Sequence, residues 1–91
     1  MAAGVAVRDN RLETYRDELF DAADSRDLVR VNNLINSELF NRVDIVALEE
    51  AYGTAHESGY VDIIEALEQS PRGLEITEQF FRVIREVYGE A

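Results

Sequence analysis

Residues 17–36 read DELFDAADSRDLVRVNNLIN, and residues 50–69 read EAYGTAHESGYVDIIEALEQ. Aligned so that Ala22 stands over Ala55, the two stretches keep small, apolar and acidic residues in the same places. A period of about 20 to 50 residues is typical of stacked repeats. The pattern predicts two copies of a helix, a tight turn and a second helix, with an alanine where the paired helices approach most closely. The matching pairs are Ala22 with Ala55, Ser25 with Ser58, Leu34 with Leu67, Leu19 with Tyr52, Leu28 with Val61, Val31 with Ile64, Asp17 with Glu50, and Asp24 with Glu57.

Apolar residues recur at spacings of three and four in five segments, which predicts about five short α-helices. Strand signals are nearly absent, so the expected fold class is all-α. Asp9 or Asn10 is a candidate N-cap for the first helix, and Gly89 suits the end of the last one. Residues 38–43 are expected to form a loop. The five stripes are Leu12, Tyr15, Leu19 and Ala22; Leu28, Val31, Leu34 and Ile35; Ile45, Leu48, Tyr52 and Ala55; Val61, Ile64 and Leu67; and Leu74, Thr77, Phe81, Ile84 and Tyr88.

The period and pattern of these hairpins resemble the ankyrin repeat, over about Asp17 to Gln69. Residues 19–28 and 55–67 look like its helix–turn–helix portion, and Gly59 stands where the family usually places its turn glycine. Two departures stand out: neither copy has the Thr-Pro-Leu-His tetrapeptide, and Arg26 replaces the first turn glycine. The resemblance implies stacked helical hairpins of a degenerate ankyrin-like kind. Residues 43–47 are out of register with the family's β-hairpin finger and also fit a helix, so we do not expect projecting fingers. The alternative is a five-helix array in which two hairpins match by chance.

The chain has 91 residues, a formal charge of −10 at pH 7 and no cysteine. This length predicts one small helical domain over residues 1–91, with residues 1–8 flexible, repeat-like hairpins over 17–69 and a C-terminal amphipathic helix over 74–88. The absence of cysteine excludes disulfides and thiolate zinc sites. The negative charge disfavours direct binding to nucleic acid or anionic membranes and favours a partner protein with a basic surface. Without a membrane-length apolar run or a secretory signal, we expect a cytoplasmic protein.

No residue pattern in the sequence indicates catalysis, a cofactor or a metal site. His56 precedes Glu57 as in a zinc-protease helix motif, but Tyr60 stands where the second histidine is required. Gly53-Thr54 lacks the glycine and lysine of a phosphate-binding loop. No glycine precedes Ser58 by two residues, so the nucleophile elbow is absent. We therefore predict a protein that is not an enzyme and a histidine with a structural role.

The last predicted helix carries a broad apolar stripe. Two repeats leave both ends of the stack open, because three or more copies are normally needed to bury a continuous core. This helix is expected either to cap one open end or to pair two chains in a homodimer. The residues of this surface are Phe80, Phe81, Ile84 and Tyr88.

The leading functional hypothesis is a non-catalytic, acidic protein-interaction module, such as an inhibitor or adaptor, that binds a basic patch on a partner. If the copies stack, acids at equivalent positions lie along one surface and steer a cationic partner. Tyr60, expected to be exposed at the second turn, is a candidate anchor because aromatic side chains dominate binding hot spots. The predicted partner-binding residues are Asp17, Asp21, Asp24, Glu49, Glu50, Glu57 and Tyr60.

Two alternatives account for the acidity differently. The first is a nucleic-acid mimic of the kind phages encode, whose carboxylates imitate phosphates and inhibit a nuclease or another DNA- or RNA-binding machine. The second is adaptation to high salt, with no bearing on partners. A mimic would displace nucleic acid from its target, whereas salt adaptation would raise stability from low to molar salt.

Overall fold

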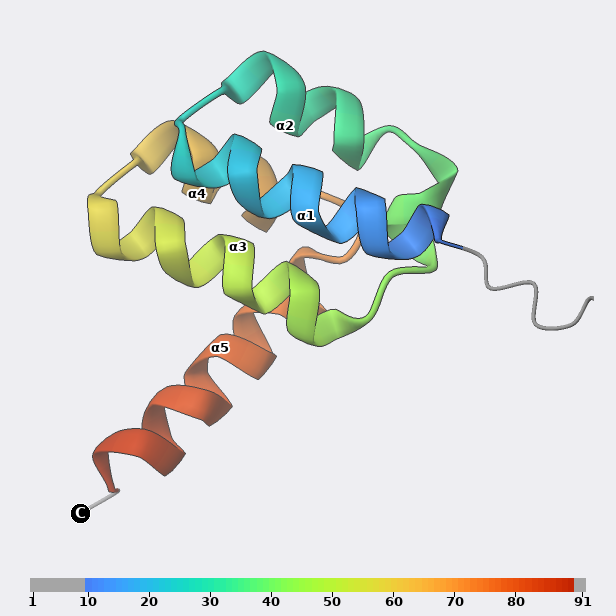
Figure 1. The fold of residues 1–91 in the computed structure, drawn as a ribbon. Coiled ribbons are helices and arrows are strands. Elements are labelled where there is room, and N and C mark those ends of the chain that lie inside the picture. Colours follow the sequence, from blue (N-terminus) through green and yellow to red (C-terminus); the bar gives the residue numbers. More distant parts are fainter. Residues whose placement is uncertain (1–9, 90–91) are drawn as a thin grey trace, which may run out of the picture.

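The computed structural model describes residues 10–89, and the predicted flexible segment 1–8 lies outside them. Within this part of the chain the predicted all-α fold class is confirmed, with five α-helices, one short 3-10 helix and no strand (Figure 1). The predicted C-cap at Gly89 is confirmed by its positive φ of 64°. The elements are α1 (Arg11–Asp24), α2 (Leu28–Ile35), η1 (Glu38–Asn41), α3 (Ile45–Ser58), α4 (Val61–Glu68) and α5 (Gly73–Tyr88).

Two helical hairpins stack with their equivalent helices side by side. The first is α1 with α2 and the second is α3 with α4; α1 packs against α3, and α2 packs against α4 (Figure 1). The second helices of the hairpins begin and end at residues that the sequence alignment pairs, Leu28 with Val61 and Ile35 with Glu68. The stacked arrangement of the hairpins therefore follows the alignment of the two stretches.

The turns of the two hairpins use the same hydrogen bonds. In each, the chain passes through a left-handed residue just after the helix, at Arg26, two residues beyond the end of α1, and at Gly59, directly beyond the end of α3. The next amide then bonds back to the last turn of the helix, which satisfies a carbonyl that the helix leaves open. The equivalent bonds run from the Asp27 amide to the Ala22 carbonyl at 2.9 Å and from the Tyr60 amide to the Ala55 carbonyl at 2.9 Å.

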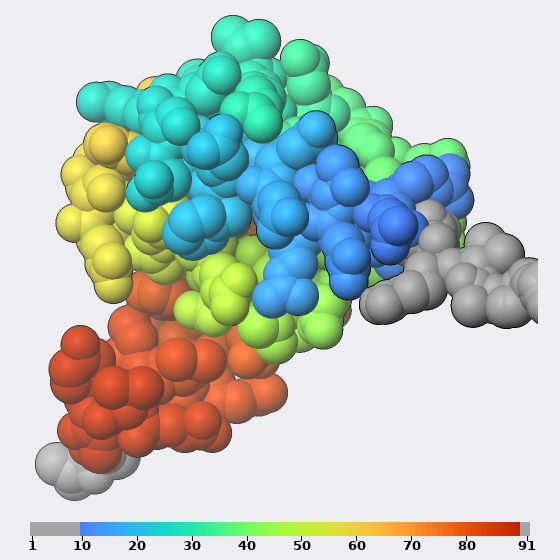
Figure 2. Space-filling view, in the orientation of Figure 1, coloured from blue at the N-terminus to red at the C-terminus, as the bar shows by residue number. Residues whose placement is uncertain are grey.

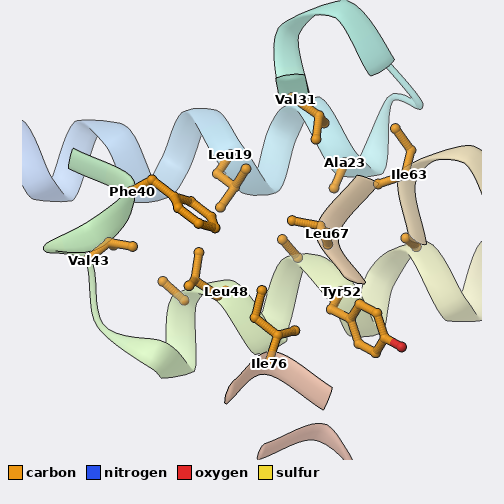
Figure 3. Close-up of a cluster of buried hydrophobic side chains, with 14 of the residues drawn as sticks. Leu19, Ala23, Val31, Phe40, Val43, Leu48, Tyr52, Ile63, Leu67 and Ile76 are labelled. Carbon is orange, nitrogen blue, oxygen red and sulfur yellow. The ribbon is translucent and has the colours of Figure 1, made fainter. Parts of the chain in front are cut away.

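The core lies between the four hairpin helices and is closed from one side by α5 (Figure 3). Ala22 and Ala55 are fully buried, as expected for small residues where helices approach closely. Burying one large apolar side chain contributes roughly 1.5–3 kcal/mol, so this cluster supplies most of the stability of so small a domain. The largest fully buried side chains are Tyr52, Phe40, Leu19, Leu48, Ile63, Leu67, Ile76 and Val31.

The segment between the hairpins was predicted as a loop, and this is wrong in part. Residues 38–41 form η1, whose first turn is capped by the Ser37 hydroxyl accepting from the Leu39 amide at 3.1 Å. Phe40 and Val43 are buried in the core. The segment that carries them therefore packs between the hairpins and α5. The sequence of this segment has no helical spacing of apolar residues, and the burial of its side chains is what holds it in a short helix.

The buried faces of α4 and α5 differ from the predicted stripes. On α4, Val61 is exposed and Ile63 is fully buried instead. On α5, Ile76 is buried, whereas Leu74 and Tyr88 of the predicted stripe are about four-fifths exposed, at 80% and 79%. Periodicity shows that a broad apolar arc exists on a helix, but it does not show which edge of that arc meets the core.

The prediction of a C-terminal capping helix holds for the first half of α5. This half packs against α3 and α4. The second half projects from the body of the protein and gives the molecule extents of 54 × 33 × 21 Å (Figures 1 and 2). Large apolar side chains on the projecting half, among them Phe81, Val87 and Tyr88, are exposed.

Candidate functional site

An open groove of about 760 Å³ runs between α1 and α3. These two helices lie side by side on the face that Figure 2 shows. We call this feature the acidic groove, because four carboxylates and one guanidinium line it. Its lining residues are Arg16, Asp17, Phe20, Asp21, Glu50, Gly53, Thr54 and Glu57.

The repeat explains why acids meet at this groove. Residues three and four apart share one face of a helix, so Asp17, Asp21 and Asp24 form a stripe along α1. Glu50 and Glu57 of α3 are the aligned counterparts of the first and last of these, so they occupy the equivalent stripe. Stacking α1 on α3 brings the stripes to the two sides of one groove, as expected for stacked copies.

Two of the groove acids are paired with arginines of the same chain. A guanidinium nitrogen of Arg16 lies 3.6 Å from Glu50, and Arg30 Nη1 donates to Asp21 at 2.9 Å. Their side chains are about half exposed, so water screens both pairs and they contribute little to stability. They can therefore exchange for pairs with another cation at little cost.

The remaining groove acids are more open. Asp17 and Glu57 are exposed and have no ion-pair partner among residues 10–89. Asp24 lies at the same side of the helix pair and accepts a hydrogen bond from the Thr54 hydroxyl at 3.5 Å. Among the carboxylates that line the groove, Asp17 and Glu57 are thus the two without an ion-pair partner in residues 10–89.

Glu49 and Tyr60 do not belong to the acidic groove. Glu49 lies on the side of α3 that faces α5. Burial raises the pKa of its carboxyl group, and the negative charge of Glu50 raises it to a smaller degree. Tyr60 was expected to be exposed, but its ring is half-buried against the core. The Arg26 guanidinium covers it at 5.3 Å from the ring centroid and bonds Asp62 at 3.3 Å. The turn of the first hairpin thus shields the turn of the second.

A second, smaller hollow of about 250 Å³ lies between α3 and the projecting half of α5. The Phe80 ring stacks on His56, with ring centroids 4.8 Å apart, and meets Tyr52 edge-on at 5.0 Å. His56 therefore helps to hold α5 against α3. Of the residues predicted for capping or dimerisation, Phe80, Ile84 and Tyr88 line this hollow. Phe81 does not line this hollow and lies instead beside Arg82 and Arg85.

Sequence reasoning missed Phe20, whose ring lines the acidic groove and is 43% exposed. The alignment of the copies contains a signal for it. Phe20 is the counterpart of Gly53, the largest difference in size between two aligned residues of α1 and α3. Because Gly53 has no side chain, it leaves the part of the groove that the two residues share open beside the Phe20 ring.

Within residues 10–89, no cluster of three or more histidine, aspartate or glutamate side chains is arranged to hold a metal ion. None of the helices between these residues has the length and apolar character needed to cross a membrane. Comparison with protein-family models, with curated proteins and with solved structures gives no match.

Proposed function

We propose that the protein is a non-catalytic interaction module that binds an arginine-rich segment of a partner protein in the acidic groove. The single observation that carries the proposal is the meeting of four carboxylates and an exposed phenylalanine ring in one open groove. The matching bounds of α2 and α4 support two copies of one helical hairpin, and that these copies are of a degenerate ankyrin-like kind is part of the proposal.

The groove offers an arginine two kinds of contact. Asp17 and Glu57 supply carboxylates, which bind the planar guanidinium through paired hydrogen bonds. The exposed face of Phe20 supplies a ring on which a guanidinium stacks, an interaction worth about 0.5–1 kcal/mol at exposed sites. Lysine carries the same charge but lacks the planar fork, so the groove favours arginine.

The internal ion pairs favour a protein partner over nucleic-acid mimicry. A mimic needs an uninterrupted row of negative charges, since duplex DNA carries one for about every 1.7 Å. Here Arg16 and Arg30 interrupt the row at Glu50 and Asp21. A partner's arginines can replace these two exposed pairs, as expected for an inhibitor or adaptor that docks on a basic surface.

The test is calorimetric titration with a short arginine-rich peptide and with a lysine peptide of the same charge. We expect the Asp17→Asn/Glu57→Gln variant to bind the arginine peptide at least about tenfold more weakly, about 1.4 kcal/mol. The matched control is Glu65→Gln/Glu86→Gln, which removes the same charge from exposed sites on α4 and α5. We expect the control to change affinity less than about twofold.

Phe20→Ala separates the two functional hypotheses. A protein-binding groove loses affinity for the arginine peptide when the ring is removed and prefers arginine to lysine. Equal weakening by the groove variant and its control, with no effect of Phe20→Ala, would mean that only net charge matters. That outcome, together with a steep dependence on salt, would replace the proposal by nucleic-acid mimicry.

A further inference from the structure

The outer face of α5 carries an exposed apolar seam. Leu74, Thr77, Phe81, Ile84 and Tyr88 follow one another at spacings of three, four, three and four residues. This is the heptad spacing by which two helices pack along a common line. Leu74, Phe81 and Tyr88 expose 80%, 55% and 79% of their surface. We call these five residues the outer seam.

The outer seam lies beside the face of α5 that contacts α3, and its Ile84 and Tyr88 also border the hollow between these two helices. Ile76 is the fully buried large side chain of α5. Phe81 follows it by five residues, which places the two side chains about 140° apart around the helix axis. The inner face also holds Phe80, which packs on Tyr52 and His56. Leu74, Phe81 and Tyr88 stay exposed and Thr77 and Ile84 are half-buried, so the contacts of α5 with α3 and α4 leave most of the seam uncovered.

The charged residues beside the seam can form ion pairs with the same residues of a second copy. Glu78 follows Thr77, and Arg85 follows Ile84, so opposite charges stand at the same heptad position in successive heptads. Neither side chain has an ion-pair partner among residues 10–89. A second α5 running antiparallel would bring its Arg85 beside Glu78 and its Glu78 beside Arg85, since a two-fold axis makes every contact twice. A parallel helix would place like charges at the same level.

We propose that the outer seam binds the outer seam of a second copy of this chain, with the two α5 helices antiparallel. In this pairing Phe81 lies opposite Ile84, and Tyr88 lies opposite Thr77, each contact occurring twice. A shallow hollow of about 330 Å³ between Thr77, Phe81 and the two arginines of α5 is open to receive the Tyr88 ring of the second copy. Pairing a large side chain with a small one across the two helices lets the interface pack closely without voids.

The pairing is confined to one helix from each chain. Interfaces below about 1,200 Å² belong to weak, exchanging complexes. The expected species is therefore a dimer whose population rises with protein concentration and falls with salt. This pairing is independent of the acidic groove, because no residue of α5 lines that groove.

Sedimentation velocity from about ten micromolar to about one millimolar measures the pairing. We expect Phe81→Glu to be monomeric throughout, with an unchanged circular dichroism spectrum because Phe81 is not part of the core. Glu86→Arg, an exposed change on the polar side of α5, is the control and leaves the dimer in place.

Charge reversal tests the antiparallel direction. Glu78→Arg and Arg85→Glu alone each place like charges together twice, so each weakens the dimer at least about tenfold. The exchanged pair Glu78→Arg/Arg85→Glu restores it. A wild-type chain that is monomeric at every concentration overturns the proposal. A dimer that is indifferent to Phe81→Glu overturns the seam, and one that the exchanged pair does not restore overturns the direction.

Discussion

Arg26 occupies in the first hairpin the left-handed backbone position that Gly59 occupies in the second, with φ of 58° and 71°. A residue with a side chain is disfavoured in this conformation by roughly 1–2 kcal/mol. The Arg26 side chain lies over the Tyr60 ring and pairs with Asp62, both in the second hairpin. The strained turn of the first hairpin therefore makes a contact between hairpins that a glycine could not make.

Substitution at this position separates the strain from the contact. Arg26→Ala keeps the strain and loses the contact, so we expect it to be less stable than Arg26→Gly by about 1 kcal/mol. Gly59→Ala introduces strain where there was none and is expected to cost about 1 kcal/mol. Urea unfolding followed by circular dichroism measures all three. Equal stability of Arg26→Ala and Arg26→Gly would show that the turn is not strained.

At Gly73, the first residue of α5, there is no room for a side chain. A Cβ built there would stand 1.9 Å from the backbone carbonyl oxygen of Glu68, so α4 and α5 could not keep their present approach. We expect Gly73→Ala to cost about 3 kcal/mol or more in unfolding free energy. Gly53→Ala is the matched control, because its Cβ would meet only ordinary contacts at 3.5 Å and beyond. Helix propensity should make this control more stable by about 0.5–1 kcal/mol.

The sequence was sufficient to predict the stacked hairpins because their information is local and repeated. Apolar spacing identified the helices, and the aligned turns at Ser25 and Ser58 located both reversals. The same alignment placed Asp17 and Glu50 on equivalent faces, so stacking alone brought most of the predicted acids into one groove.

What could not be predicted depends on contacts between elements distant in the chain. Phe40 is buried because the hairpins and α5 leave a space that its ring fills, and no local period records this. On α5 the apolar arc is wider than the body can cover, so burial selects Ile76 and leaves Leu74 exposed. Tyr60 is half-buried because Arg26 folds over it, an interaction between residues of different repeats.

Arg72 joins α5 to the segment between the hairpins. Its Nη1 donates to the carbonyls of Phe40 at 3.0 Å and Val43 at 2.6 Å, and its Nε donates to Glu75 at 2.7 Å. Loss of charge-assisted bonds to partly buried carbonyls is costly, so we expect Arg72→Ala to destabilise the protein by about 2–3 kcal/mol. Arg82→Ala, on the exposed side of α5, should change stability by less than about 0.5 kcal/mol. Thermal and urea unfolding of the two variants decide whether the link is needed.

Two tyrosine hydroxyls make the fold sensitive to alkaline pH. Tyr15 donates to the Leu34 carbonyl at 2.6 Å, and Tyr52 donates to Glu68 Oε2 at 2.5 Å. Burial raises the pKa of both phenols above the ordinary value of 10.0, and the bond to Glu68 raises that of Tyr52 further. A raised pKa means that the folded state resists ionisation, so this stabilisation is complete below pH 10 and is lost as pH rises above it. We expect the double variant Tyr15→Phe/Tyr52→Phe to lose about 1 kcal/mol of unfolding free energy per hydrogen bond at pH 7. As the pH rises further above 10, the wild type loses stability through these phenols and the variant does not, so the variant becomes the harder of the two to unfold. Tyr88→Phe, on the exposed end of α5, is the control, and urea unfolding at stepped pH values makes the measurement. Parallel stability curves for the double variant and the wild type would show that these hydroxyls do not govern alkaline unfolding.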